Sequence, residues 1–250
     1  MRPLDVIKQK RRYEMFGAKT KEKVLEVNKF FGKYNMQFED RIKKLFVYYD
    51  TPDKDLEKSN IVLFKTQIGN FCELNMATEK INKSLKYNYR TNNKHFTKQI
   101  KHGEKLMKHK DFLIDNFKAM FLSSINFDPE FLMRKLEEAY IIKTVSLEYR
   151  SINLSGLKIT YSFDSDVYIN CEHKIETTKN IMTIYQHSSE KTDEDFEDLN
   201  SKLIRYCKEL TPTNETKISL ARRLTQKKYE QLEKAKADKL REKLLKKKKK

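Results

Sequence analysis

The alternation of side chains between Leu157 and Glu176 is the strongest constraint on the fold of this chain. Odd positions in this stretch are mostly apolar, and even positions are mostly polar or charged. A period of two over this length predicts sheet with one buried face and one wet face, interrupted by a turn. Shorter strand patterns are predicted at residues 10–16, 44–49, 61–67, 71–76, 85–90, 144–152 and 181–186.

Helical spacing separates these groups of strands. It predicts helices over residues 20–33, within 94–122, from Asp128-Pro129 to about Tyr140, and over 192–210. The strands are grouped and the helices are inserted between the groups, so the pattern is unlike a βαβαβ repeat. This order favours an antiparallel α+β architecture, of which a closed barrel is one form.

Positive charge is concentrated at the C-terminal end of the sequence. The 250 residues carry a formal net charge of +17. Residues 217–250 hold 15 Lys and Arg against 4 Asp and Glu, a net +11, which leaves 17 − 11 = +6 for residues 1–216. The composition of this tail favours a helix. Two interpretations stay open: a solvated helix, or an electrostatic arm for nucleic acid, an anionic membrane or an acidic partner.

Several functional classes find no support in the sequence. No run of about 18 uncharged apolar residues is available for a membrane helix. The three cysteines are odd in number and far apart, which favours a reducing compartment, and we expect a cytoplasmic location. Walker, dinucleotide-binding, nucleophile-elbow and H-E-x-x-H motifs are missing. His95, His102 and His109 recur every seven residues, a spacing too wide for ligands of one metal on a helix face.

The predicted strands carry both signs of charge on one face, and this pattern has two explanations. A solvated sheet face shows mixed charges because opposite charges on neighbouring strands attract weakly. Alternatively, the strands close around an interior in which Lys and Arg bind a phosphate chain and carboxylates hold a divalent ion.

One segment resembles a known family. Val47-Tyr48-Tyr49-Asp50-Thr51-Pro52-Asp53, followed by Ser59-Asn60-Ile61-Val62-Leu63, is similar to the Y-F-D-T-P-D turn and following strand of the triphosphate tunnel superfamily, which includes the CYTH and VTC polyphosphate polymerase domains. Weaker likenesses follow in the same order: Arg12 to Phe16 with R-Y-E-x-K, Cys72 to Asn75 with L-E-I-K, the basic stretch Lys86 to Arg90, Val145 to Arg150 with V-x-V-x-Y-R, and Leu157 to Asp164 with L-R-I-T-F-D.

The resemblance implies an antiparallel tunnel that binds tri- or polyphosphate with Mg²⁺ or Mn²⁺. It implies Glu14 and Glu73 as metal ligands. The basic positions that it implies as phosphate contacts are Arg12, Lys65, Lys86, Arg90, Arg150 and Lys158.

This sequence also departs from the family pattern at charged positions. The expected basic residues are replaced by Phe16 in the first strand, Phe64 and Thr66 in the third, and Asn75 in the fourth, and the expected last-strand glutamate is Thr183. Each lost charge-assisted contact costs about 1.5–3 kcal/mol in a dry site. The departures therefore weaken the expectation of catalysis more than that of the fold.

The sequence predicts a tunnel-like domain over residues 8–212, an antiparallel β-barrel with a helical insert, and a lysine-rich helical tail over 213–250. The expected function is the binding, and the metal-dependent turnover if activity is retained, of tripolyphosphate, polyphosphate or a nucleoside triphosphate. An active form is expected to be a polyphosphate polymerase or a triphosphatase. The alternative is a catalytically degenerate scaffold whose tail docks on nucleic acid, an anionic membrane or an acidic partner.

Overall fold

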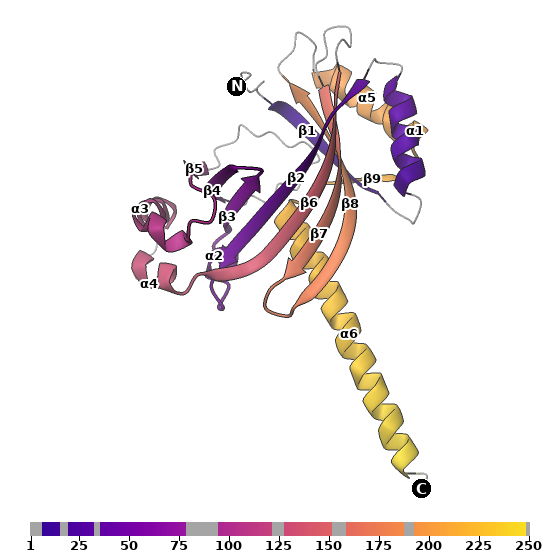
Figure 1. The fold of residues 1–250 in the computed structure, drawn as a ribbon. Coiled ribbons are helices and arrows are strands. Elements are labelled where there is room, and N and C mark those ends of the chain that lie inside the picture. Colours follow the sequence, from indigo (N-terminus) through magenta and orange to yellow (C-terminus); the bar gives the residue numbers. More distant parts are fainter. Residues whose placement is uncertain are drawn as a thin grey trace.

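A single antiparallel sheet organises the molecule. The computed structural model describes residues 7–15, 20–32, 36–78, 95–121, 128–151, 159–187 and 193–248. Nine strands are ordered β5-β4-β3-β2-β6-β7-β8-β1-β9 (Figure 1). They are β1 (Ile7–Met15), β2 (Met36–Asp50), β3 (Ile61–Ile68), β4 (Phe71–Thr78), β5 (His95–Gln99), β6 (Glu137–Ser151), β7 (Ile159–Asn170), β8 (Ile175–His187) and β9 (Leu210–Thr213).

Six α-helices accompany the sheet in this part of the chain. They are α1 (Thr20–Gly32), α2 (Asp55–Lys58), α3 (Lys110–Met120), α4 (Pro129–Arg134), α5 (Asp193–Tyr206) and α6 (Lys217–Lys248). A 3₁₀ turn, η1 (Leu106–His109), precedes α3. None of the described helices has the length and apolar character needed to cross a membrane.

The predicted antiparallel α+β architecture is confirmed, with one difference in its closure. Neighbouring strands are antiparallel throughout, but β5 and β9 are the two ends of the sheet rather than partners of each other in the described part of the chain. The predicted barrel is therefore an open sheet there. Both end strands are short, with five residues in β5 and four in β9, so each edge offers few backbone groups for pairing.

The long alternating stretch forms the β7–β8 hairpin, and the interruption expected within it is a turn at residues 171–174. Lys174 in this turn has a φ of 52°, the left-handed conformation that reverses the chain. The hairpin pairs along its whole length, from Ile159 opposite Gln186 to Asn170 opposite Ile175.

Helices on the outer face of the sheet bury two apolar clusters. We call this face outer because α6 lies against the other one. Near β1, β7 and β8, α1 and α5 contribute Phe31, Phe196 and Leu203 to the first cluster. Near β3 and β4, the helices α3 and α4 contribute Leu113 and Leu132 to the second. Figure 1 shows these two groups of helices at opposite ends of the sheet.

The inner face receives the first turns of α6. Ile218, Leu220 and Ala221 are buried there against a cluster that includes Ile142 and Tyr168. The rest of the helix extends away from the sheet (Figure 1). A helix therefore occupies most of the predicted tail, but its first turns are part of the protein core, and the predicted boundary at residue 213 falls on the last residue of β9.

The predicted insert is less helical than expected. Residues 95–99 form the edge strand β5, and α4 ends at Arg134, because β6 already begins at Glu137. The start of α4 agrees with the prediction. The Asp128 carboxylate accepts hydrogen bonds from the backbone N–H groups of Glu130 and Phe131, and Pro129 occupies the first helical position.

Candidate anion-binding site

The D-T-P-D segment, on which the family resemblance mainly depends, is a structural turn. The buried Asp50 carboxylate accepts hydrogen bonds from the backbone N–H groups of Thr51 at 2.8 Å, Leu56 at 2.9 Å and Glu57 at 3.1 Å. These contacts satisfy donors at the start of α2 that have no partner inside a helix. The motif therefore fixes the chain between β2 and β3, and its own carboxylates take no part in the site described below.

Strand register decides which charged side chains share the inner face. Directly paired residues of antiparallel strands point to the same side of a sheet. Arg12 pairs with Thr183, which pairs with Ser162, and Glu14 pairs with Ile181, which pairs with Asp164. Since Ile181 belongs to the cluster that packs against α6, these positions all lie on the inner face.

The sequence-predicted site residues divide into three groups. Arg12, Glu14, Glu73 and Arg150 lie on the inner face, although Glu73 on β4 and Arg150 at the end of β6 are far from β1 along the sheet. Lys65 pairs with Val47 and Leu74, so its side chain belongs to the outer face. Lys86, Arg90 and Lys158 lie outside the described residues.

One of the family positions with a neutral residue in this sequence, Phe64, helps to receive α6. Phe64 lies on the inner face, stacks on Tyr48 with ring centroids 5.2 Å apart, and packs against the cluster that holds the first turns of α6. Thr66, Asn75 and Thr183 also point to the inner face and are buried. An aromatic packing surface therefore replaces part of the expected cationic lining.

Two buried aspartates on β7 form the centre of a polar network on the inner face. Asp164 accepts a hydrogen bond from the Ser146 hydroxyl at 2.7 Å, and Asp166 accepts one from Tyr168 at 2.8 Å and another from Thr144. The Lys217 ammonium of α6 lies 3.1 Å from Asp164 and 2.7 Å from Asp166. Burial alone would raise the pKa of Asp164, but the charge of Lys217 and the Ser146 hydrogen bond hold it below its ordinary value.

Glu14 is also paired with cations. Its two carboxylate oxygens lie 2.8 Å from Arg223 on α6 and 3.0 Å from Lys179 on β8. Farther along the face, Lys44 lies 2.6 Å from Glu148. The acidic side chains in this region are therefore largely neutralised within the protein.

These pairings bear on the metal that the fold family implies. A divalent ion of this kind needs several oxygen ligands converging on one point. Glu14 is held by two cations, whereas Glu73, on β4, accepts a hydrogen bond from the Asn75 amide at 3.1 Å. The described residues contain no group of three or more His, Cys, Asp or Glu placed to hold a metal ion. The predicted ligand pair therefore does not fit a divalent ion in this arrangement.

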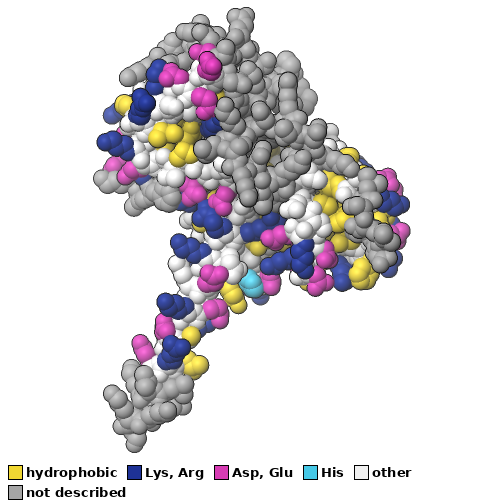
Figure 2. Space-filling model, turned by 180° about the vertical axis from the view of Figure 1, so that it is seen from behind, with side chains coloured by type: hydrophobic (Ala, Val, Ile, Leu, Met, Phe, Trp, Pro, Cys, Tyr) yellow, Lys and Arg dark blue, Asp and Glu magenta, His cyan; other side chains and the backbone are white. Residues whose placement is uncertain are grey.

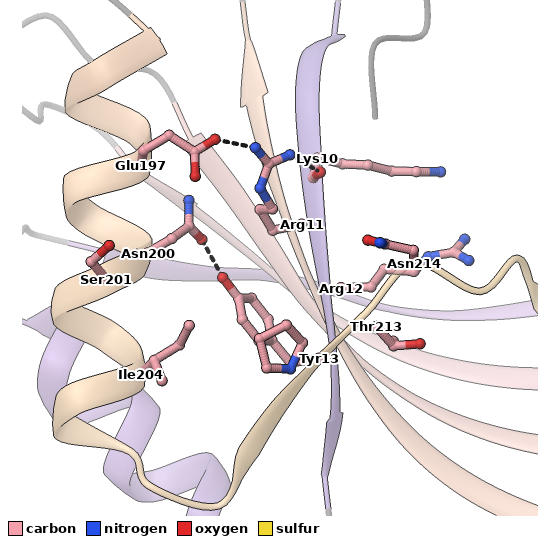
Figure 3. A pocket seen from close by; sticks show the side chains of 11 residues that line it. Lys10, Arg11, Arg12, Tyr13, Glu197, Asn200, Ser201, Ile204, Thr213 and Asn214 are labelled. Carbon is pink, nitrogen blue, oxygen red and sulfur yellow. Dashed lines mark hydrogen bonds and ion pairs between the residues drawn. The ribbon is translucent and has the colours of Figure 1, made fainter. Parts of the chain in front are cut away.

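A different cluster lies in the first half of β1, around Arg12, where the pairing of β1 with β9 ends. Figure 3 shows Lys10 and Arg12 on one side of β1, and Arg11 and Tyr13 on the other side, facing α5. Arg11 pairs with Glu197, and the Tyr13 hydroxyl donates a hydrogen bond to Asn200 at 2.6 Å. A cavity of about 150 Å³ lies between β1 and α5, lined also by residues 212–214 at the end of β9. The charged ends of Lys10 and Arg12 point away from α5, to the inner face (Figure 3).

Arg12 and Lys10 have an unusual electrostatic setting. The Arg12 guanidinium donates a hydrogen bond to the Glu215 carbonyl oxygen at 2.8 Å, and no carboxylate among the described residues pairs with it. Lys10 is partly buried on the same side of β1. Desolvation, followed by the positive charges of Arg12 and Lys217, lowers the pKa of Lys10 well below its usual value. This corner of the inner face therefore has a local excess of positive charge.

Sequence reasoning did not identify Lys10 or Lys217 as site residues. The sequence does indicate Lys10, because positions 10, 12 and 14 of the first predicted strand point to the same face as each other. Lys217 had none, because its contacts with Asp164 and Asp166 join residues about 50 positions apart whose proximity depends on the tertiary fold.

No protein-family model matches the chain, and no curated protein matches it in sequence. Several solved structures resemble it. HpAC1 from Hippeastrum, named as an adenylyl cyclase and described as having a dominant triphosphatase activity, has 8% sequence identity and a TM-score of 0.52, with 85% of this chain and 94% of that chain covered.

Two further similar structures come from microorganisms. The PH1819 protein from Pyrococcus horikoshii OT3 has 14% identity and a TM-score of 0.45, over 84% of this chain and 97% of that one. A protein from Bacillus halodurans named as an adenylate cyclase has 9% identity and a TM-score of 0.46, over 85% and 95%. The likeness to HpAC1 confirms the predicted triphosphate tunnel fold for this chain.

Proposed function

We propose, on the premise that this chain has the triphosphate tunnel fold, that it binds an oligophosphate anion at the end of β1, with Lys10 and Arg12 as the anchoring cations. The observation that carries the proposal is the Arg12 guanidinium, which has no carboxylate partner among the described residues and lies on the same side of β1 as the partly buried Lys10 (Figure 3).

The chemistry of these two side chains suits a phosphoryl group. A guanidinium has five N–H donors in a planar fork, and the described contacts of Arg12 use one backbone acceptor. The remaining donors match the bidentate geometry of phosphate oxygens. An anion next to Lys10 would also offset the repulsion from Arg12 and Lys217 that disfavours its charged form. Both cations therefore gain more from an anionic ligand than from water.

Binding has more support than turnover. Phosphoryl transfer depends on concentrated positive charge around the transferred group and on its alignment with a nucleophile. On this inner face, Lys44, Lys179 and Lys217 are already paired with carboxylates, and neutral residues replace the family's charged ones at Phe64, Thr66, Asn75 and Thr183. We therefore propose binding without rapid hydrolysis.

The observation that favours a second candidate, a scaffold without a small-molecule ligand, is the packing of α6 on Phe64 and its neighbours. In that case the inner face serves to anchor α6, and the charged side chains contribute to stability and specificity of the fold. The two candidates make opposite predictions for a titration with tripolyphosphate.

Isothermal titration calorimetry with tripolyphosphate and with ATP, in EDTA, tests the proposal. Arg12→Ala is expected to weaken binding about 10-fold to 100-fold, the equivalent of one charge-assisted hydrogen bond. Arg134→Ala is the matched control, because Arg134 is an exposed arginine on α4 that pairs with Glu130 and lies outside the site. Its affinity is expected to equal that of the wild type.

Phosphate release from the same compounds, measured in parallel, separates binding from turnover. Binding without release supports the proposal as stated. Release that Arg12→Ala abolishes would establish a triphosphatase at this site. If neither compound binds, or if Arg12→Ala and Arg134→Ala behave alike, the oligophosphate proposal is overturned and the scaffold is left.

A further inference from the structure

Lys217 lies in a cage of oxygen atoms on the inner face. Its ammonium nitrogen is 2.7 Å and 2.8 Å from the two carboxylate oxygens of Asp166, 3.1 Å from Asp164 and 3.1 Å from the Thr144 hydroxyl. The side chain of Lys217 is 14% exposed, and those of Asp164 and Asp166 are 6% and 0% exposed. The ring of Phe46 lies 5.6 Å from the same nitrogen.

This set of ligands is of the kind that a hard cation uses. Carboxylate and hydroxyl oxygens are typical donors to Mg²⁺, Mn²⁺ and Ca²⁺. Here four such oxygens surround one ammonium group, which has three N–H donors. Hydrogen bonds from Ser146 and Tyr168 orient the aspartates from behind, as outer partners orient the ligands of a metal. The cage therefore already holds a cation, which is the ammonium group of Lys217 rather than a bound metal ion.

The helix that supplies Lys217 also neutralises Glu14. Arg223 of α6 lies 2.8 Å from one oxygen of this carboxylate, and Lys179 occupies the other at 3.0 Å. Three buried or partly buried carboxylates of the inner face thus have amino or guanidinium groups where a divalent ion would otherwise be needed for charge balance.

We propose that Lys217 takes the place of a divalent metal ion on the inner face, so that this chain does not bind Mg²⁺ or Mn²⁺ there and takes up its anion in the metal-free form. The first half of the proposal, that no Mg²⁺ or Mn²⁺ binds in the cage, depends only on the geometry of the cage. The second half rests on the proposed function, the binding of an oligophosphate at Lys10 and Arg12.

Manganese binding, followed by electron paramagnetic resonance of free Mn²⁺, tests the first half without any anion. The wild-type protein is expected to bind no stoichiometric Mn²⁺ at micromolar concentration. Lys217→Ala, which opens the cage but keeps Asp164 and Asp166, is expected to gain one site. Lys202→Ala, which frees the exposed Asp198 on α5, is the matched control and is expected to gain none.

A wild-type protein that binds one Mn²⁺ overturns the proposal, and this measurement needs no variant. A Lys217→Ala protein that keeps the wild-type circular dichroism spectrum but gains no Mn²⁺ also overturns it, because the cage would then not be a cation site. Loss of the gained Mn²⁺ in the double variant Lys217→Ala with Asp166→Asn would place the ion in this cage.

The second half is tested by the sign of the magnesium effect. Magnesium complexes free tripolyphosphate, so added Mg²⁺ is expected to weaken binding to the wild-type protein. An affinity that rises with Mg²⁺ overturns metal-free uptake. If tripolyphosphate does not bind with or without Mg²⁺, the proposed function fails, and the Mn²⁺ measurement alone decides the role of Lys217.

Discussion

Lys10 is a partly buried cation whose charge is opposed by the charges of Arg12 and Lys217. Desolvation and the repulsion from Arg12 and Lys217 lower its pKa in the folded chain. The unfolded chain therefore binds more protons than the folded chain at pH values between the lowered pKa and the ordinary one, and stability rises with pH through that window. A charged side chain that costs stability in the folded chain is typical of a binding site rather than of a core.

Replacing Lys10 by methionine is therefore expected to separate stability from binding. Lys10→Met keeps the shape of the stem but removes the charge, so the free energy of unfolding should rise at pH values below the window. Urea unfolding across pH checks this, and the rise of stability with pH should flatten in the variant. Tripolyphosphate affinity should fall about tenfold. Lower stability together with unchanged affinity would contradict the prediction.

The wild-type affinity for an anion is expected to fall as pH rises through the lowered pKa of Lys10, because the neutral amine no longer attracts phosphate. Groups near this lysine include Arg12 on its own strand, Lys217 on α6 and, across the β1–β8 ladder, Tyr185. Burial raises the pKa of Tyr185 to about 12, so this phenol stays neutral through the titration. Calorimetry at several pH values checks the sign, and an affinity that rises with pH would contradict it.

Asp50 allows a test of the turn that carries the family resemblance. Asp50→Ala removes the acceptor of three backbone N–H groups in a buried position, so we expect a loss of about 2 kcal/mol in the free energy of unfolding. The control is Asp53→Ala in the same turn, whose exposed side chain lies 3.4 Å from Lys135 and should change stability by less than about 0.5 kcal/mol. Equal losses in urea unfolding would contradict a structural role for Asp50.

At the scale of residues, the sequence predicted which face of a strand a side chain occupies better than it predicted which side chains contact each other. Alternation correctly placed Arg12 and Glu14 on one face of the first strand. Lys65 shares its parity with Leu63, a core residue, and so points to the outer face. The alternation with the apolar residues next to Lys65 already indicates the outer face, whereas the family resemblance implied a phosphate contact on the inner face. The ion pairs of Lys217 and Arg223 were unreadable, because they join distant segments.

At the scale of elements, α6 has two parts, one packed in the core and one exposed to solvent. Its first turns bury Ile218, Leu220 and Ala221, whereas the described residues from 226 onward are mostly exposed. Averaged over its 32 residues, the apolar pattern is diluted by lysine and glutamate, which is why the sequence predicted a tail rather than a core element. The strands were easier to predict, because an alternation of period two is visible within a few residues.

Two truncations test this division. Deletion of residues 227–250 removes mostly exposed helix, whose contacts with the β7–β8 hairpin include a hydrogen bond from Lys228 and the stacking of Tyr229 on His173, and is expected to shift the melting temperature by less than a few degrees. Deletion of residues 217–250 exposes the inner apolar cluster and leaves Asp164, Asp166 and Glu14 without Lys217 and Arg223, so we expect loss of cooperative unfolding or of soluble protein. Thermal unfolding followed by circular dichroism checks both. Equal stability of the two would show that the first turns contribute nothing to the core.

At the scale of the whole molecule, the projecting part of α6 presents both signs of charge. Figure 2 shows basic and acidic side chains interspersed along it. The sequence adds five lysines at residues 246–250. Docking of this segment on nucleic acid or an anionic membrane stays a prediction. Binding to single-stranded RNA or to anionic liposomes should weaken steeply with salt, and deletion of residues 227–250 should remove that dependence. A slope that the deletion leaves unchanged would contradict it.

One continuous helix runs from the buried Lys217 to the last lysines of the chain. At 1.5 Å per residue its 32 residues span about 48 Å, with one end clamped by ion pairs and the other held by nothing in the described molecule. The helix is packed against the sheet at its start and projects from it over the rest of its length (Figure 1). A partner bound at the far end would therefore be joined by one unbroken helix to Lys217 and its ion pairs with Asp164 and Asp166.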